Sequence, residues 1–374
     1  MNPSIDEIIK QRRIIITCGT GGVGKTTLSA AIAIRAALLG KRAVVVTIDP
    51  AKRLANSLGL DQLQDTPTDL TPQIQEAWKK IRTTFPESAL QSGLPEPNEM
   101  KMGTLAAIIP DTRRTFENFV NDLSPSPQVA NKVMNNPIFQ IFAREFSGTN
   151  EYMALERLYS LYKQDKYDCI ILDTPPSRNT LAFLNAPKLL AQFFEEKLIR
   201  WLVLPTNKLF SAGMKKALSI LERLTGAGFM THLFDFANAL FEVQINFTAN
   251  LKKITSLLES PSAGFLIVTT PTADTNQEIQ HFLKVLKEHQ FHYDGAILNR
   301  MMGLFDIKTT PIGFESPFAV IRERQNRERQ ALENLVRQPS SICAKIPELA
   351  RDVHSVEDLL HVAMALHHSA LCSI

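Results

Sequence analysis

The sequence lacks paired cysteines. Four cysteines occur among its 374 residues, at Cys18, Cys169, Cys343 and Cys372, and no two of them form a CxxC pair. This spacing excludes a zinc ribbon and gives no framework of disulfide bonds. We therefore expect buried, reduced thiols and no zinc, as is usual for a cytoplasmic protein.

Long apolar runs and a clustered charge are also lacking. No stretch approaches the roughly 20 apolar residues that a membrane-spanning helix needs, and residues 1–13 have no apolar core of the signal-peptide kind. The net charge is only +3, the pI is about 8.6, and the basic residues are spread along the chain. A nucleic-acid-binding protein usually carries a basic stripe. These features favour a cytoplasmic globular protein that binds no nucleic acid.

Six short β-branched runs indicate the strands of a parallel sheet. They are almost continuously apolar, as strands covered on both faces should be, and helical patterns follow most of them. The runs are RIIITC (13–18), AVVVTI (43–48), CIILD (169–173), FLIVTT (265–270), AILN (296–299) and ICAKI (342–346). They predict an α/β fold with a doubly wound, mostly parallel sheet.

The spacing of these runs indicates two insertions. About 120 residues separate the second run from the third, and about 90 separate the third from the fourth. One helix and its loops need far fewer residues, and both long segments have helical patterns. We predict one α/β domain from residues 1–60, 165–186 and 260–374, and a helical subdomain from residues 61–164 and 187–259.

A glycine-rich segment, GTGGVGKTT (19–27), follows the first strand and begins a helix. It matches the phosphate-loop pattern GxxxxGK[ST] in full, and it lies in the context that this motif requires. Gly21, Gly22 and Gly24, with Val23 between them, let backbone N–H groups converge on phosphate oxygens where a Cβ would obstruct them. The N-terminus of the following helix adds a positive dipole. The α/β domain is therefore predicted to bind a nucleotide.

Three side chains at the end of this loop have distinct expected roles. Lys25 is expected to contact the β- and γ-phosphates and to serve catalysis, Thr26 to ligate Mg²⁺, and Thr27 to bind the α-phosphate. The cofactors predicted from the loop are ATP and Mg²⁺.

Two aspartates end predicted strands and would face the same crevice, because the carboxyl ends of parallel strands form one edge of a sheet. Asp49, in IDPAKR, is a candidate to orient or deprotonate the attacking water and to contact Mg²⁺ through water. This stretch alone also fits an N-cap aspartate before Pro50. Asp173, in YDCIILDTPP, is expected to hold Mg²⁺ through water, with a turn aspartate as the alternative.

These segments together resemble the arsenite-pump-driving and tail-anchored-protein-targeting ATPases, and most closely their bacterial anion-transporting-ATPase-like branch. The resemblance covers most of the chain and is carried by GTGGVGKTT, IDPAKRLANSLGL, NEYMALERL, LDTPPSRNTLAFLNAP, LNR and IPELARDVHSVEDL. It implies an ATPase that hydrolyses ATP, built as a homodimer or as a heterodimer with a related chain, with nucleotide domains and a helical subdomain.

The resemblance also assigns roles to single residues. It implies that Asp49 is the catalytic carboxylate of the first switch segment and that Asp173 is the carboxylate of the second. It further implies that Asn299 binds adenine and that the chain around Pro347 lines the base. From the residues alone, Asn299 at a strand end fits a base edge and equally fits a turn or cap.

The sequence departs from the family pattern in two ways. The family loop usually carries a first lysine that contacts phosphate across the dimer, and this chain has Thr20 there. Hydrolysis is then slow, or a related partner chain supplies the lysine, or another cation such as Arg178 replaces it. The zinc-binding CxxC of the targeting branch and the cysteine cluster of the arsenite branch are both missing from the sequence.

The function expected is ATP hydrolysis that switches a dimer and its helical subdomain. Residues 187–259 are rich in large aromatic side chains, which suit either a groove for a hydrophobic or membrane-protein client or the core of the subdomain itself. A catalytic subunit of an anion efflux pump and a small-molecule kinase on the same fold remain alternatives.

Overall fold

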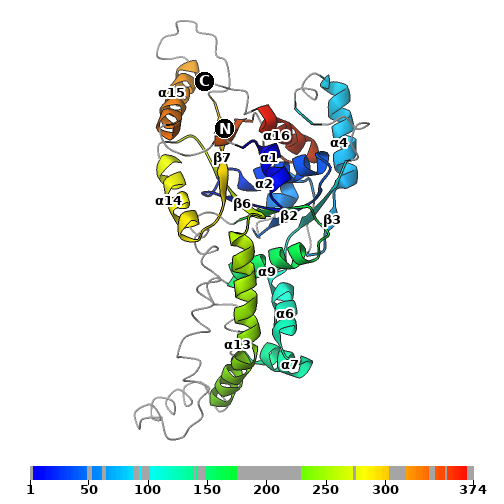
Figure 1. Ribbon diagram of the computed structural model, residues 1–374. Helices are drawn as coiled ribbons and strands as arrows, with labels where there is room; N and C mark the ends of the chain where they lie inside the picture. The colour runs from blue at the N-terminus through cyan, green and yellow to red at the C-terminus, as the bar shows by residue number, and fades with distance from the viewer. Residues whose placement is uncertain are drawn as a thin grey trace. The chain divides into compact units, whose positions relative to one another are not determined.

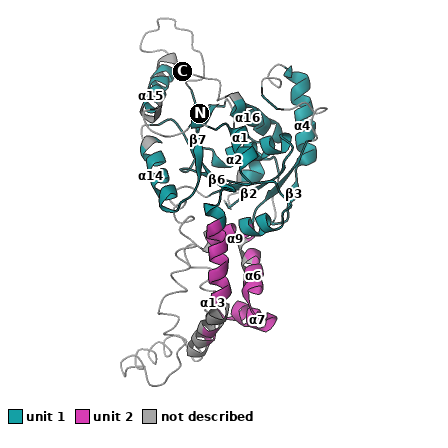
Figure 2. Cartoon of the chain, in the orientation of Figure 1, with its two compact units in different colours: residues 1–110, 158–181, 257–374 teal, residues 111–157, 182–256 magenta. Residues whose placement is uncertain are grey.

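The computed structural model describes residues 3–48, 53–60, 65–86, 92–94, 102–137, 140, 149–174, 229–272, 275–302, 317–336, 342–349 and 352–368. The chain divides into two compact units, which Figure 2 colours separately. Residues 1–110, 158–181 and 257–374 form the first unit, and residues 111–157 and 182–256 form the second.

One mostly parallel sheet forms the centre of the first unit (Figure 1). Within the described residues it has eight strands in the order β3-β4-β2-β5-β1-β6-β7-β8, and all neighbours are parallel except the antiparallel pair β3–β4. The strands are β1 (Ile14–Cys18), β2 (Arg42–Thr47), β3 (Thr68–Asp69), β4 (Thr104–Ile108), β5 (Cys169–Asp173), β6 (Ala263–Thr269), β7 (Tyr293–Met301) and β8 (Ile342–Pro347). The predicted α/β fold class is confirmed, and the six predicted runs correspond to six of these strands.

Helices flank the sheet and also build the second unit. The helices of the first unit are α1 (Ile5–Gln11), α2 (Lys25–Leu38), α3 (Arg53–Ser57), α4 (Thr71–Thr84), α14 (Thr275–Glu288), α15 (Pro317–Val336) and α16 (Val356–His368). The second unit contains α6 (Thr112–Leu123) and α7 (Pro127–Asn135). Two further helices, α9 (Thr149–Lys163) and α13 (Phe229–Glu259), begin in the second unit and end in the first.

The chain leaves the middle of the sheet in two directions. From β1, helix α2 leads to β2 on one side, whereas from β6, helix α14 leads to β7 on the other. Because such crossovers are right-handed, α2 and α14 cover opposite faces. The central strands β1 and β5 are buried on both faces, as their apolar runs predicted. In folds of this kind, ligands bind outside the carboxyl ends of the strands where the direction changes.

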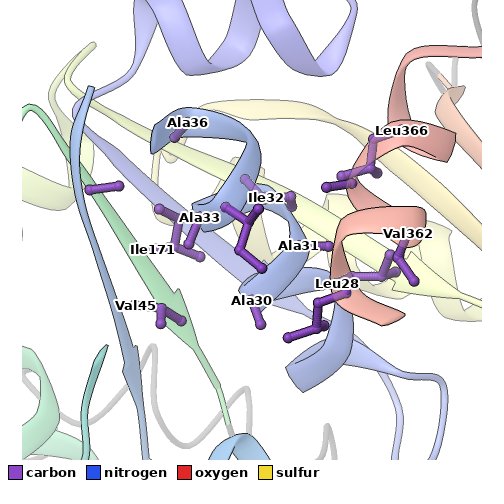
Figure 3. Close-up of a cluster of buried hydrophobic side chains, with 14 of the residues drawn as sticks. Leu28, Ala30, Ala31, Ile32, Ala33, Ala36, Val45, Ile171, Val362 and Leu366 are labelled. Carbon is purple, nitrogen blue, oxygen red and sulfur yellow. The ribbon is translucent and has the colours of Figure 1, made fainter. Parts of the chain in front are cut away.

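Helix α2 is buried on nearly all sides. Its alanines, such as Ala33, leave room for close packing between the sheet and α16. Figure 3 shows Ile32 of α2 between Ile171 of β5 and Val362 of α16. This packing fixes the helix that follows the glycine-rich loop.

The segment 65–110 differs from its predicted place in the helical subdomain. Residues 104–108 form β4, a parallel neighbour of β2, and β3 pairs with β4 in turn. Helix α4 packs against α16 and β4. These elements cover the edge that β2 would otherwise expose, so the segment belongs to the first unit and the first insertion begins near residue 111.

The second unit is helical where it is described. Its core includes the rings of Phe119, Tyr152 and Phe247, whose centroids lie 5.3–5.6 Å apart. Phe247, one of the aromatic residues of the predicted block 187–259, therefore belongs to the core of the second unit itself. Residues 187–228 of that block lie outside the described residues. No helix in the described part of the chain is long and apolar enough to cross a membrane.

A buried ion pair joins three helices of the first unit. The Arg35 side chain on α2 is fully buried, and its Nη2 lies 2.7 Å from the Asp6 carboxylate on α1. Its Nη1 donates to the carbonyl oxygen of Ala363 on α16 at 2.9 Å. Removing one partner from such a pair leaves an uncompensated buried charge.

Asp6→Asn is accordingly expected to lower the free energy of unfolding by about 3 kcal/mol. The matched control is Asp168→Asn. Asp168 pairs with Arg42 on the surface, where both side chains are at least 36% exposed, and such pairs contribute about 0–1 kcal/mol. Urea denaturation measures both changes. Equal losses for the two variants would show that Arg35 does not depend on Asp6.

The described cysteines are free and buried, as predicted, at Cys18, Cys169 and Cys343. Cys372 lies outside the described residues. Burial raises the pKa of each of the three thiols to about 12, and the thiolate is the reactive form.

Iodoacetamide at pH 8 should therefore leave these three cysteines unmodified in the native protein, because only about one thiol in 10⁴ would be ionised even if it were reached. Mass spectrometry of peptides locates the modified sites, and the same reaction in urea should modify all four cysteines. Rapid native modification of Cys18, Cys169 or Cys343 would contradict the burial.

Candidate active site

The glycine-rich loop connects β1 to α2 at the carboxyl edge of the sheet. Gly24 is the N-cap of α2 and has a left-handed backbone (φ 90°), so the helix begins without a side-chain cap. Gly22 is also left-handed (φ 81°), and a Cβ built on it would meet no atom within 4 Å. The loop therefore presents glycine backbone and the N-terminus of a 14-residue helix to open space, which suits an anion.

Lys25 is the first residue of α2, and its side chain is buried within the loop. Its Nζ donates to the carbonyl oxygens of Gly19 at 2.9 Å and Thr20 at 2.8 Å. The ammonium group therefore spans the first turn of the loop and stabilises its curved shape. Lys25 also lines the cavity described below.

Thr26 and Asp173 are brought together from positions 147 residues apart. The Thr26 hydroxyl donates to Asp173 Oδ2 at 2.7 Å. The Thr47 hydroxyl, at the end of β2, donates to the same oxygen at 2.8 Å. A threonine hydroxyl beside a carboxylate is the oxygen set that Mg²⁺ prefers next to a phosphate loop.

Asn299, near the end of β7, packs directly against the loop. Its Nδ2 donates to the carbonyl oxygen of Val23 at 2.8 Å, whereas the Val23 side chain is buried in the core. A Cβ on Gly24 would lie 2.3 Å from Asn299 Nδ2. Asn299, which is predicted to bind adenine, therefore also holds the loop in place.

Two adjoining cavities open beside these groups. The larger has a volume of about 410 Å³ and is lined by Gly22, Gly24, Lys25, Thr26, Thr27, Asn56, Ser57, Thr174, Arg300, Asp352, Val353 and His354. The smaller has about 100 Å³ and is lined by Gly24, Thr27, Leu28, Asn299, Arg300, Ile346, Pro347, Glu348, Leu349, Asp352, Val353 and Val362. Polar groups of the loop thus face the larger cavity, and Asn299 and Pro347 face the smaller one.

The structure adds residues that the sequence analysis did not single out. Thr47 contacts Asp173, whereas Arg300, Asp352 and His354 line the larger cavity. Arg300 has a left-handed backbone (φ 59°), which is uncommon for arginine. It directly follows Asn299 in LNR, and the other two lie in IPELARDVHSVEDL. The sequence analysis singled out the segments that contain these residues, but which side chains line a cavity depends on the fold.

Not every predicted residue can be placed. Asp49 and Arg178 lie outside the described residues. Thr20 is described, and its hydroxyl lies 3.5 Å from the Glu278 carboxylate of α14, which also accepts from Thr269 at 3.2 Å. Among the described side chains that line the larger cavity, the cations are Lys25 and Arg300, with His354 beside them.

A family model described as anion-transporting ATPase matches residues 12–78 and 124–368. The chain belongs to this family. The family resemblance seen in the sequence is thus confirmed. The family is one of ATPases, and membership implies ATP binding.

Curated relatives include several named ATPases. "Putative arsenical pump-driving ATPase 2" of Aquifex aeolicus is 23% identical over 295 residues, which cover 78% of this chain and 80% of that protein. A second Aquifex aeolicus protein of that name, numbered 1, is 23% identical over 359 residues, or 95% of this chain and 78% of that protein. The ATPase get3 of Aspergillus terreus is 28% identical over 192 residues, which span about half of each chain (51% and 48%).

The contact between Gly24 and Asn299 can be tested through stability without any ligand. Gly24→Ala and Gly22→Ala both place a side chain on a left-handed backbone, which costs about 1–2 kcal/mol. Only at Gly24 does the new Cβ also meet Asn299. Gly24→Ala should therefore unfold at a clearly lower urea concentration than Gly22→Ala. Equal midpoints would show that Asn299 does not pack against the loop.

Proposed function

We propose that this chain is a Mg²⁺-dependent ATPase that hydrolyses ATP by attack of water on the γ-phosphate. The observation that carries the proposal is the bond between Thr26 and Asp173 beside the buried Lys25, at the wall of the 410 Å³ cavity. That arrangement offers an ammonium group for phosphate, a hydroxyl for the metal and a carboxylate that fixes the hydroxyl.

The residues described here suit the nucleotide and the metal. Glycine backbone with no Cβ faces the larger cavity, where a side chain would fill the space needed by phosphate. Thr27 would bind the α-phosphate together with the backbone of Gly21, Gly22 and Gly24. The bound Mg²⁺ would neutralise charge on the phosphates. Thr26 would hold it directly, and Asp173 through water.

The base and sugar would extend into the smaller cavity. Asn299 offers both a donor and an acceptor there, and Pro347 and Leu349 offer apolar surface. This arrangement supports assignment of the smaller cavity to adenine.

The catalytic step would use Asp49 as the group that orients or deprotonates the attacking water. Lys25 would stabilise the charge that develops on the γ-phosphate. Positioning and electrostatics supply most of the catalysis in phosphoryl transfer.

Nucleotide binding would switch a dimer of identical or related chains, and the switch would act on the helical unit. Two helices, α9 and α13, run from the helical unit into the sheet unit, and α9 leads through a short connection to β5, which ends at Asp173. A hydrophobic segment or a membrane-protein client is the partner class that we propose for the helical unit. The names of the Aquifex relatives favour a second role, in driving an anion pump.

The experiment compares the native chain with Asp49→Asn and Lys25→Met. Phosphate release from ATP with Mg²⁺ and ATP affinity are measured for all three proteins. Asp49→Asn should keep ATP affinity and lose about 10²–10⁴-fold in turnover, as expected for a general base. Lys25→Met should weaken ATP binding by about 10–150-fold, since it loses charge-assisted bonds.

Two results would contradict the proposal. ATP binding that survives Lys25→Met unchanged would place the nucleotide elsewhere on the chain. If the native chain turned ATP over no faster than Asp49→Asn, this chain would not hydrolyse ATP on its own. Phosphate transfer to a small acceptor in place of water would instead identify a kinase.

A further inference from the structure

Three residues at the carboxyl edge of the sheet lie directly beside one another on neighbouring strands. Asp173 of β5 is in register with Thr47 of β2 on one side and with Thr17 of β1 on the other. Residues in register on parallel strands present their side chains to the same face. Here that face carries α2, because Asp173 binds Thr26 and Thr17 binds Ser29 on that helix.

The Asp173 carboxylate accepts hydrogen bonds from two threonine hydroxyl groups, those of Thr26 and Thr47, through one of its oxygens. Oδ2 lies 2.7 Å from Thr26 Oγ1 and 2.8 Å from Thr47 Oγ1. An ionised carboxylate has acceptors and no donor, so both hydroxyl protons point toward it. The lone pairs of the Thr26 oxygen are then directed away from Asp173, and Thr26 is one of the residues that line the larger cavity.

Thr47 does not line the two cavities described above. Its side chain is fully buried. Through its bond to Asp173, Thr47 can act on the site without itself lining either cavity.

We propose that Thr47 is a positioning residue for the metal of the nucleotide site. Its hydroxyl holds the Asp173 carboxylate in the orientation that accepts the Thr26 proton, and this leaves the Thr26 oxygen free to ligate Mg²⁺. Groups that orient metal ligands in this way typically change metal affinity by 10–100-fold. The inference rests on the proposed Mg²⁺-ATP site and assigns one more residue to it.

The position of Thr47 in the chain gives the contact a second consequence. Thr47 lies two residues before Asp49, the proposed catalytic carboxylate. Its bond to Asp173 ties the strand that leads to one carboxylate to the strand that ends in the other. The backbone N–H of Ile48 adds a second tie by donating to the Asp173 carbonyl oxygen at 3.3 Å.

The test uses Thr47→Val, which keeps the shape of the side chain and removes the hydroxyl, and Thr47→Ser, which keeps the hydroxyl. ATP affinity is measured by calorimetry in EDTA and over a series of Mg²⁺ concentrations. Binding of Mn²⁺ to the ADP complex is measured by electron paramagnetic resonance. Neither readout depends on turnover.

Thr47→Val should raise the Mg²⁺ concentration needed for half of the gain in ATP affinity by about tenfold. It should also weaken Mn²⁺ binding by a similar factor. ATP affinity in EDTA should stay within about twofold of the native value, because Lys25 and the loop are untouched. Thr47→Ser should restore the native metal dependence.

The matched control is Thr17→Val. Thr17 is equally buried at the same edge, but its hydroxyl bonds to Ser29 at 2.7 Å and to the Leu172 carbonyl oxygen at 3.2 Å rather than to Asp173. This variant should lose stability and keep the native metal dependence within about twofold. If Thr47→Val does not fold, Thr47→Ala removes the same hydroxyl and carries the same expectation.

Two outcomes would overturn the inference. One is an unchanged metal dependence in a folded Thr47→Val or Thr47→Ala protein. The other is an equal loss of ATP affinity with and without Mg²⁺, which would indicate a general distortion of the loop. Failure of the native chain to bind ATP at all would instead refute the proposed function, so the two failures are distinguishable.

Discussion

The arrangement of the candidate site depends on the hydrogen bonds that the Asp173 carboxylate accepts. It is fully buried at the end of β5, between β1 and β2, and a buried charge is tolerated only where hydrogen bonds compensate it. Thr26 supplies one such bond from α2 and Thr47 supplies another from β2. Two strands and the helix after the glycine-rich loop are thereby fixed to one another at a single oxygen atom.

Helix α2 is held at both ends by buried polar contacts. Near its N-terminus, Thr26 binds Asp173 and Ser29 binds Thr17; near its C-terminus, Arg35 binds Asp6 of α1. Between these points its apolar residues pack against the sheet and α16. A site that must hold phosphate oxygens to within a fraction of an ångström needs such a rigid support.

Local patterns predict the parts of this molecule in which neighbouring residues act together. The six apolar runs correspond to strands, and the GxxxxGK[ST] segment lies between a strand and a helix as its pattern requires. Strand β4 was missed because TLAAI is short, contains two alanines among its five residues, and follows a segment rich in proline and glycine. Thr47 and Arg300 could not be found in this way, since their roles come from strand register and cavity walls formed by distant segments.

The first turn of the loop carries Thr20, where the family pattern is expected to have a lysine. Lys25 donates to the carbonyl oxygens of Gly19 and Thr20 and so stabilises this turn. Thr20 adds no positive charge, and the carboxylate of Glu278 lies 3.5 Å from its hydroxyl. The attraction that the loop itself exerts on an anion therefore comes from Lys25, from backbone N–H groups and from the dipole of α2.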